Sequence, residues 1–159
     1  MIKGKENKQL GQTLLEALIA LGTAVVIISA MSVLVLSSLN NAQFSKNQNQ
    51  ATQYAQQGIE VLKNLAQSNW ASFSILSGHY CLPQDNVLVP SATCSLPNLG
   101  SFGREVDITL DSASCAPRTS LVTVTVSWSD NKCTSAIDPY CHKIPIISCI
   151  YNTTTVTTP

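Results

Sequence analysis

The sequence predicts an α+β protein in which one long N-terminal helix, its first half transmembrane, packs on a small antiparallel β-sheet head stapled by disulfides. Three observations support this prediction. A long uncharged run follows a lysine-rich start, and a polar segment with apolar residues at helical spacing comes next. The remaining residues, 70–159, alternate in places with period two and hold all six cysteines.

The uncharged run is long enough to cross a bilayer. No Asp, Glu, Lys or Arg occurs from Ala17 to Ser45, and Leu14 to Leu36 is almost wholly apolar. About 20 apolar residues suffice for a membrane-spanning helix. With no proline in the run, we expect an uninterrupted helix.

Charge before the run sets its orientation. Residues 1–11 hold three lysines and one acid, and positive flanks stay in the cytoplasm, so everything after Leu39 is expected outside. An ordinary signal peptide has a shorter apolar region, about 7–15 residues, followed by a small-residue cleavage site. A plain signal anchor is the alternative.

Glu16 is the one carboxylate at the edge of the run. An ionisable side chain costs about 2.5–3.5 kcal/mol at the bilayer centre and less near an end, so a functional partner is expected. Gln12 lies four residues earlier, on the same side of a helix. The alternative is a glutamate that snorkels to the interface without a partner.

A short motif joins the basic start to the run: Gly11-Gln12-Thr13-Leu14-Leu15-Glu16-Ala17-Leu18. Together with the lysine-rich leader, it resembles the N-terminus of the type IV prepilins, the family of pilus subunits and secretion-system pseudopilins. The resemblance implies that a membrane peptidase cuts between Gly11 and Gln12, that Gln12 is then N-methylated, and that Glu16 acts in assembly. The family usually has Phe where this chain has Gln12, and many major pilins have Pro where it has Val33. Both differences favour a minor pilin or pseudopilin.

The resemblance implies a pilin-like fold and four regions: a leader (1–11), a transmembrane and filament-core helix (12–39), its amphipathic continuation (40–69), and a β-rich head with a Thr-rich tail (70–159). The implied function is a structural subunit of a type IV pilus-like or type II secretion-like filament. Its partners would be other pilin or pseudopilin subunits, the prepilin peptidase and membrane lipids. The precursor would be a single-pass protein of the cytoplasmic membrane, and the mature form would lie in an extracytoplasmic or cell-surface filament. The alternative function is a signal-anchored extracytoplasmic binding or adhesion protein.

Cleavage would create a free α-amino group on Gln12, with a reference pKa of about 7.7–8.0. This amine could pair with Glu16 of the same chain or of a neighbour. In a helical bundle without water, a paired charge is tolerated and a lone one is expensive.

Beyond Leu39 the pattern predicts a continued helix and then strands. A stripe at three- and four-residue spacing extends the helix to about Gln67, and it consists of Ala51, Tyr54/Ala55, Gly58/Ile59, Leu62 and Leu65/Ala66. Period-two alternation predicts strands at Val122–Trp128 and at Phe102–Leu110, where Arg104 interrupts the apolar face. A third strand is expected at Ile144–Tyr151, with Pro145 marking its start or a sheet edge.

The six cysteines favour disulfides over zinc. An even number in a small exported domain is typical of a disulfide framework, and six allow 15 pairings. The loop positions favour Cys133–Cys141 between the last two strands and Cys81–Cys94 after the helix, which leaves Cys115–Cys149 by elimination. Zinc is the rival, but no C-x-x-C or H-x-x-x-H spacing occurs, and the adjacent Cys141 and His142 would point to opposite sides of a strand.

The sequence holds no recognisable catalytic constellation, so we expect no enzyme, cofactor or metal. His79 is expected in a loop and His142 at an exposed strand start, while Asp107 and Asp111 are expected at a solvated strand end. A net charge of zero, falling to −2 without the leader, gives no basic patch for nucleic acid.

Overall fold

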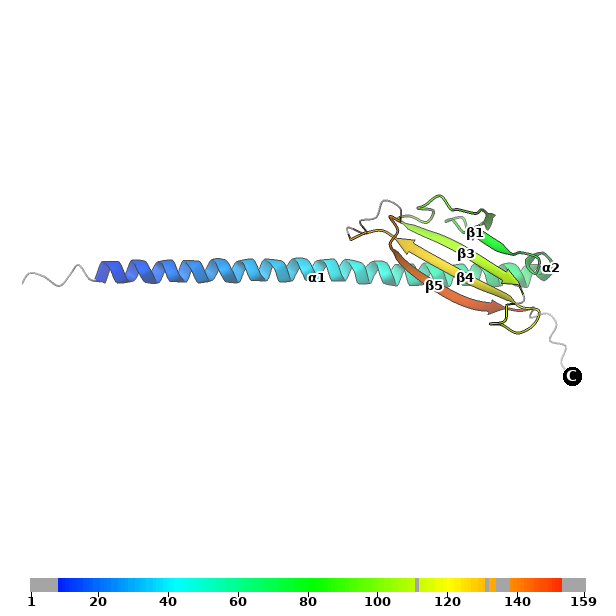
Figure 1. The fold of residues 1–159 in the computed structure, drawn as a ribbon, viewed down its shortest axis with the longest axis horizontal. Coiled ribbons are helices and arrows are strands. Elements are labelled where there is room, and N and C mark those ends of the chain that lie inside the picture. The colour runs from blue at the N-terminus through cyan, green and yellow to red at the C-terminus, as the bar shows by residue number, and fades with distance from the viewer. Residues whose placement is uncertain (1–8, 111, 131, 134–137, 153–159) are drawn as a thin grey trace, which may run out of the picture. The chain divides into compact units, whose positions relative to one another are not determined.

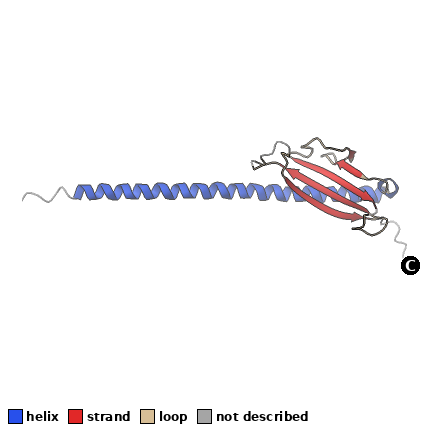
Figure 2. Cartoon of the chain, viewed as in Figure 1, coloured by secondary structure: helices blue, strands red, loops and turns tan. Residues whose placement is uncertain are grey.

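The computed structural model describes residues 9–110, 112–130, 132–133 and 138–152 (Figure 1). The chain divides into two compact units, one up to Ser45 and one from Lys46 onward. Its elements are α1 (Gln9–Ser68), α2 (Trp70–Phe73), β1 (Gly78–Cys81), β2 (Val89–Pro90), β3 (Phe102–Leu110), β4 (Ser120–Trp128) and β5 (His142–Ile150). The fold is therefore α+β, with a long N-terminal helix, an antiparallel sheet and disulfides (Figure 2).

The expected long helix is confirmed. α1 contains 60 residues and no proline, so no ring interrupts its hydrogen-bond ladder. The short helix α2, which the sequence pattern did not predict, begins immediately afterwards. Its first turn is capped by Asn69, whose Oδ1 accepts a hydrogen bond from the Ser72 amide at 3.0 Å.

The sheet has five antiparallel strands in the order β2-β1-β3-β4-β5. The three predicted strands are confirmed as β3, β4 and β5, whereas the short β1 and β2 were not predicted. The expectation that His79 lies in a loop is wrong, because His79 is in β1 and pairs with Asp107 of β3. Asp107 is solvated as expected, but it lies within β3 and not at its end. Asp111 lies outside the described residues.

β5 forms one edge of the sheet, so its outer backbone groups have no neighbouring strand to pair with. Pro145, which lacks an N–H, lies inside this strand opposite Thr125. The expected edge position of Pro145 is therefore confirmed.

The core of the second unit lies between one face of the sheet and the end of α1. The buried stripe on α1 matches the predicted one except at Leu65, which is 39% exposed, and Tyr54, which is half-buried. The helix comes close to the sheet at Gly58, because a Cβ there would lie 2.9 Å from Val124 Cγ1. The fully buried sheet residues facing α1 include Val106, Val122, Val124 and Val126.

Arg104 is the fully buried charge in this core, on the α1-facing side of β3. Its Nε donates to the Leu82 carbonyl at 2.9 Å, and its Nη2 donates to the Pro83 carbonyl at 3.0 Å and to Asn86 Oδ1 at 2.6 Å. Nη1 donates to two acceptors on α1 at 3.3 Å each, the Tyr54 carbonyl and Gln57 Oε1. The guanidinium thus joins β3, α1 and the segment after β1.

We expect Arg104→Met to destabilise the head by at least about 3 kcal/mol, because each buried acceptor left without a donor costs about 1–3 kcal/mol. Arg104→Lys should be intermediate, since an ammonium has three donors and lacks the planar fork. Denaturant unfolding of the purified chain measures both changes. Lys63→Met, at an exposed position on α1, is the control and should change stability by less than about 0.5 kcal/mol. A stability loss for Arg104→Met no greater than the control's would contradict the role of Arg104.

Candidate functional site

The first unit presents its apolar side chains to its surroundings. The large apolar residues of α1 from Leu14 to Leu39 are 53–69% exposed. This helix is long and apolar enough to cross a membrane, and it is the one such helix in the described part of the chain. Side chains of this kind need an apolar environment, which a bilayer or other helices can supply.

Hydroxyl groups in this segment bond back to their own helix. Thr23 Oγ1 donates to the Ala20 carbonyl at 2.9 Å, and Ser29 Oγ donates to the Val25 carbonyl at 2.8 Å. Ser32 does the same four residues back, at 2.9 Å. These bonds satisfy polar groups that would otherwise be costly in lipid.

Glu16 lies on α1 with an exposed side chain. It is the single acidic or basic residue between Thr13 and Ser45. The backbone of Gly11 and Gln12 belongs to the first turns of α1, whereas their side chains lie outside the described part. On a regular helix the Gln12 backbone nitrogen is one turn from Glu16, which is within pairing distance for a free amine.

The six cysteines form three disulfides: Cys81–Cys94, Cys115–Cys149 and Cys133–Cys141. All three expected pairs are confirmed, the two inferred from loop positions and Cys115–Cys149, which was left by elimination. They close loops of 13, 34 and 8 residues respectively. Each ties a loop to the sheet, because one cysteine of every pair lies in or beside a strand.

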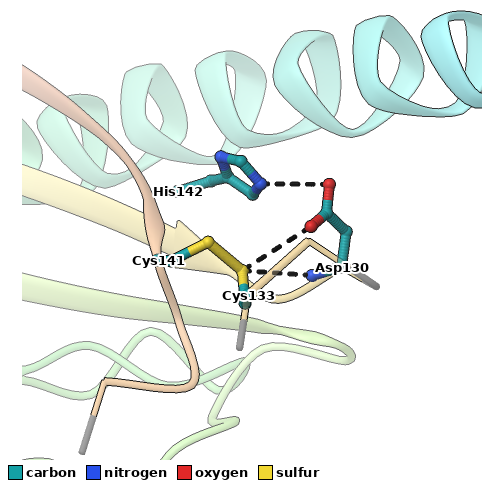
Figure 3. A group of neighbouring side chains, drawn as sticks. All are labelled: Asp130, Cys133, Cys141 and His142. Carbon is teal, nitrogen blue, oxygen red and sulfur yellow. Dashed lines mark hydrogen bonds and ion pairs between the residues drawn. A yellow bond between two sulfur atoms is a disulfide. The ribbon is translucent and has the colours of Figure 1, made fainter. Parts of the chain in front are cut away.

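The Cys133–Cys141 disulfide forms a cluster with two neighbouring polar side chains (Figure 3). Asp130, Cys133, Cys141 and His142 bring their nitrogen, oxygen and sulfur atoms within 4.8 Å of one another. The expectation that Cys141 and His142 point apart is therefore wrong, because Cys141 precedes β5 and is not bound by the alternation of a strand. His142 does begin β5, but its side chain is only 22% exposed and stacks on Trp128 at 5.2 Å.

The other histidine lies in a second polar cluster. His79 Nδ1 is 2.8 Å from Asp107 Oδ1, and its Nε2 is 3.5 Å from Glu105 Oε1. Cys94 Sγ, which is bonded to Cys81, lies 3.7 Å from the same Nε2. Sequence spacing could not reveal this group, because it depends on the pairing of β1 with β3.

The Asp130–His142 contact predicts a pH dependence. Burial raises the pKa of Asp130, but a hydrogen bond from the Lys132 amide, the contact with His142 and the nearby positive charges outweigh it and hold this pKa below its usual value. A carboxyl with a lowered pKa stabilises the folded state above its unfolded pKa of about 3.9. This stabilisation is lost as the pH falls through the lowered folded value.

We therefore expect the stability difference between wild type and Asp130→Asn to be largest near neutral pH and to shrink as the pH falls below about 4. Thermal unfolding followed at several pH values measures it. Asp138→Asn is the control for a surface carboxylate, because Asp138 pairs with Lys143 and is more exposed than Asp130. A difference for Asp130→Asn that stayed constant with pH would contradict the assignment.

No protein-family model, curated protein or solved structure matches this chain.

Proposed function

We propose that the chain is a structural subunit of a type IV pilus-like or type II secretion-like filament, with the character of a minor pilin or pseudopilin. It is cleaved after Gly11, methylated on the new N-terminal Gln12 and assembled through its apolar helix. The observation that carries the proposal is the first part of this helix, which exposes large apolar side chains from Leu14 to Leu39 and has Glu16 as the single charged residue between Thr13 and Ser45.

A helix with this character suits two successive environments. In the precursor, lipid covers the apolar side chains; in a filament, the helices of neighbouring subunits cover them. Small residues at Ala20, Gly22 and Ala24 favour close approach of such helices, and a Cβ added at Gly22 would meet nothing within 4 Å.

Glu16 provides a register for assembly under this proposal. The amine created at Gln12 and the carboxylate of Glu16 on a neighbouring subunit neutralise each other in the apolar bundle. A subunit displaced along the axis would leave both charges unpaired, so the pair specifies one axial position.

The head fits the same proposal. A long helix followed by an antiparallel sheet is the arrangement that the prepilin resemblance implies. Three disulfides and no free cysteine in the described residues suit an oxidising, extracytoplasmic compartment.

The second candidate is an anchored binding protein, and one observation favours it. The head has an apolar groove of about 760 Å³ between the end of α1 and the segment before β2. Its lining includes Val61, Leu65, Leu76, Val87 and Leu88. A volume in this range suits a small apolar ligand. A binding function would, however, leave the motif at Gly11 unexplained.

Processing separates the two candidates. Co-expressed with a prepilin peptidase, the chain should lose residues 1–11 and begin with N-methyl-Gln12, as shown by intact mass. Gly11→Val should block the cut by crowding the scissile bond. Gly22→Val, the same substitution inside the apolar run, should leave the cut unchanged. An uncut wild-type chain, or a cut near residues 39–43, would defeat the filament proposal.

Removing the charge of Glu16 should impair assembly and spare the head. We expect Glu16→Leu to insert into membranes at least as well as wild type, because it removes a polar group from an apolar run. Its incorporation into filaments should fall sharply, since each Gln12 amine would then lack a counter-charge. Glu16→Asp, which keeps the charge on a shorter stem, should be intermediate.

Quantitative blotting of sheared filaments against total membrane protein measures incorporation. Glu60→Leu, at an exposed glutamate on the head part of α1, is the matched control and should incorporate normally. Wild-type incorporation of Glu16→Leu would make Glu16 a residue of the membrane interface without a role in assembly.

A further inference from the structure

The cluster at the turn end of the β4–β5 hairpin, next to the Trp128–His142 pair, holds four side chains of the types that bind zinc. We propose that, once a two-electron reductant opens the Cys133–Cys141 disulfide, the two thiolates, His142 and Asp130 bind one Zn²⁺ (Figure 3). Thiolate sulfur, imidazole nitrogen and carboxylate oxygen are all established zinc donors. The inference does not rest on the proposed filament function.

Two donor–donor distances lie near those of a tetrahedral zinc site, and the two sulfurs, which are bonded to each other in this structure, would separate once reduced. Zinc–sulfur and zinc–oxygen bonds of about 2.3 and 2.1 Å place the two donors about 3.6 Å apart in a tetrahedral site, and Cys133 Sγ lies 3.7 Å from Asp130 Oδ1. Nitrogen and oxygen donors would be about 3.4 Å apart, and His142 Nε2 lies 3.0 Å from Asp130 Oδ2. The carboxylate therefore lies between the sulfur and the imidazole, where it can turn one oxygen toward a shared ion.

The surrounding structure holds these donors in place. His142 pairs with Trp128 across the hairpin, and the two rings stack with an interplanar angle of 27°. Asp130 and Cys133 belong to one turn, in which the Cys133 amide donates to the Asp130 carbonyl at 3.0 Å. In return, the Asp130 amide donates to Cys133 Sγ at 3.4 Å, so the sulfur and the carboxylate are held in the same turn.

The cluster around His79 would not gain two thiolates on reduction. It holds His79, Glu105 and Cys94, but the sulfur bonded to Cys94 belongs to Cys81, which is not part of the group. Reduction would therefore add a single thiolate there, against two in the Asp130 cluster. The His79 cluster is thus a control within the same chain.

The reaction balances as follows. A phosphine and one water reduce the disulfide to two thiols and leave the phosphine oxide. Zn²⁺ then displaces two protons, one from each thiol, and forms two zinc–sulfur bonds. A dithiol reductant would give the same two thiols and its own cyclic disulfide.

The test uses the full chain in detergent. The protein is reduced with a phosphine, freed of reductant, mixed with Zn²⁺ and passed over a desalting column, after which bound zinc is counted and each cysteine is mapped by alkylation. We expect about one Zn²⁺ per reduced chain, none on the oxidised chain, and protection of Cys133 and Cys141 from alkylation. The other four cysteines should react as they do without zinc. Absence of zinc, equal binding to oxidised protein, or protection of other cysteines instead would overturn the proposal.

Two histidine variants supply the matched comparison. His142→Ala should weaken zinc binding by at least about tenfold. Removing a residue that only hydrogen-bonds to a metal ligand already lowers metal affinity by about that factor, and His142 would be a ligand itself. His79→Ala should leave binding unchanged. Wild-type affinity in His142→Ala, or a loss of binding in His79→Ala alone, would also overturn the proposal. If His142→Ala fails to fold by circular dichroism, the alkylation pattern of the wild type decides the question.

Discussion

A guanidinium with neutral partners lies at the centre of the head, and three separate parts of the chain are arranged around it. Among the described residues, no acidic side chain forms an ion pair with Arg104. Burial lowers the pKa of Arg104, and the nearby Tyr54 opposes this, yet an arginine stays charged throughout the physiological range. Its charge must therefore be solvated by protein oxygens. Because these oxygens come from α1 and from the segment after β1, the two elements must keep fixed positions against β3.

The same constraint accounts for the composition of α1 within the head. For the guanidinium to reach the Tyr54 carbonyl, the helix must come close to the sheet, and it does so on small residues. Ala51, Ala55 and Gly58 face the core there. In the first unit the same helix carries Leu, Ile and Val, which are exposed. In the head the apolar residues of α1, including the larger Ile59 and Leu62, are buried, whereas those from Leu14 to Leu39 are exposed. The two parts of α1 therefore differ in what covers their apolar side chains.

The sequence predicted the parts of the fold that depend on a long regular pattern. The helix follows from an apolar run and the stripe at helical spacing that comes after it, and two of the three nine-residue strands follow from period-two alternation. β1 and β2 were missed because four and two residues are too few to show alternation. Arg104 was visible as a break in an apolar face, which is a signal for a buried charge. Its acceptors were not visible, because three of them are backbone carbonyls that only the tertiary fold brings together.

Two disulfide pairs could be predicted from loop positions and the third by elimination, but the surroundings of the sulfurs could not be predicted. The error at Cys141 arose from treating it as part of a strand that begins one residue later. Placing Cys141 before the strand brings it to His142 and Asp130. The four donor side chains then meet because the hairpin closes, without a standard metal-binding spacing in the sequence.

The three disulfides differ in how much they stabilise the folded chain, because they close loops of different length. Chain-entropy arguments assign about 3 kcal/mol to Cys81–Cys94, nearly 4 kcal/mol to Cys115–Cys149 and about 2.5 kcal/mol to Cys133–Cys141, in the order of the loops they close. The smallest contribution comes from Cys133–Cys141, the disulfide next to Asp130 and His142. Opening this pair removes the least constraint, and β4 and β5 remain joined by nine paired residues. Under the zinc proposal, a cation held by the freed sulfurs would close the same short loop as the disulfide.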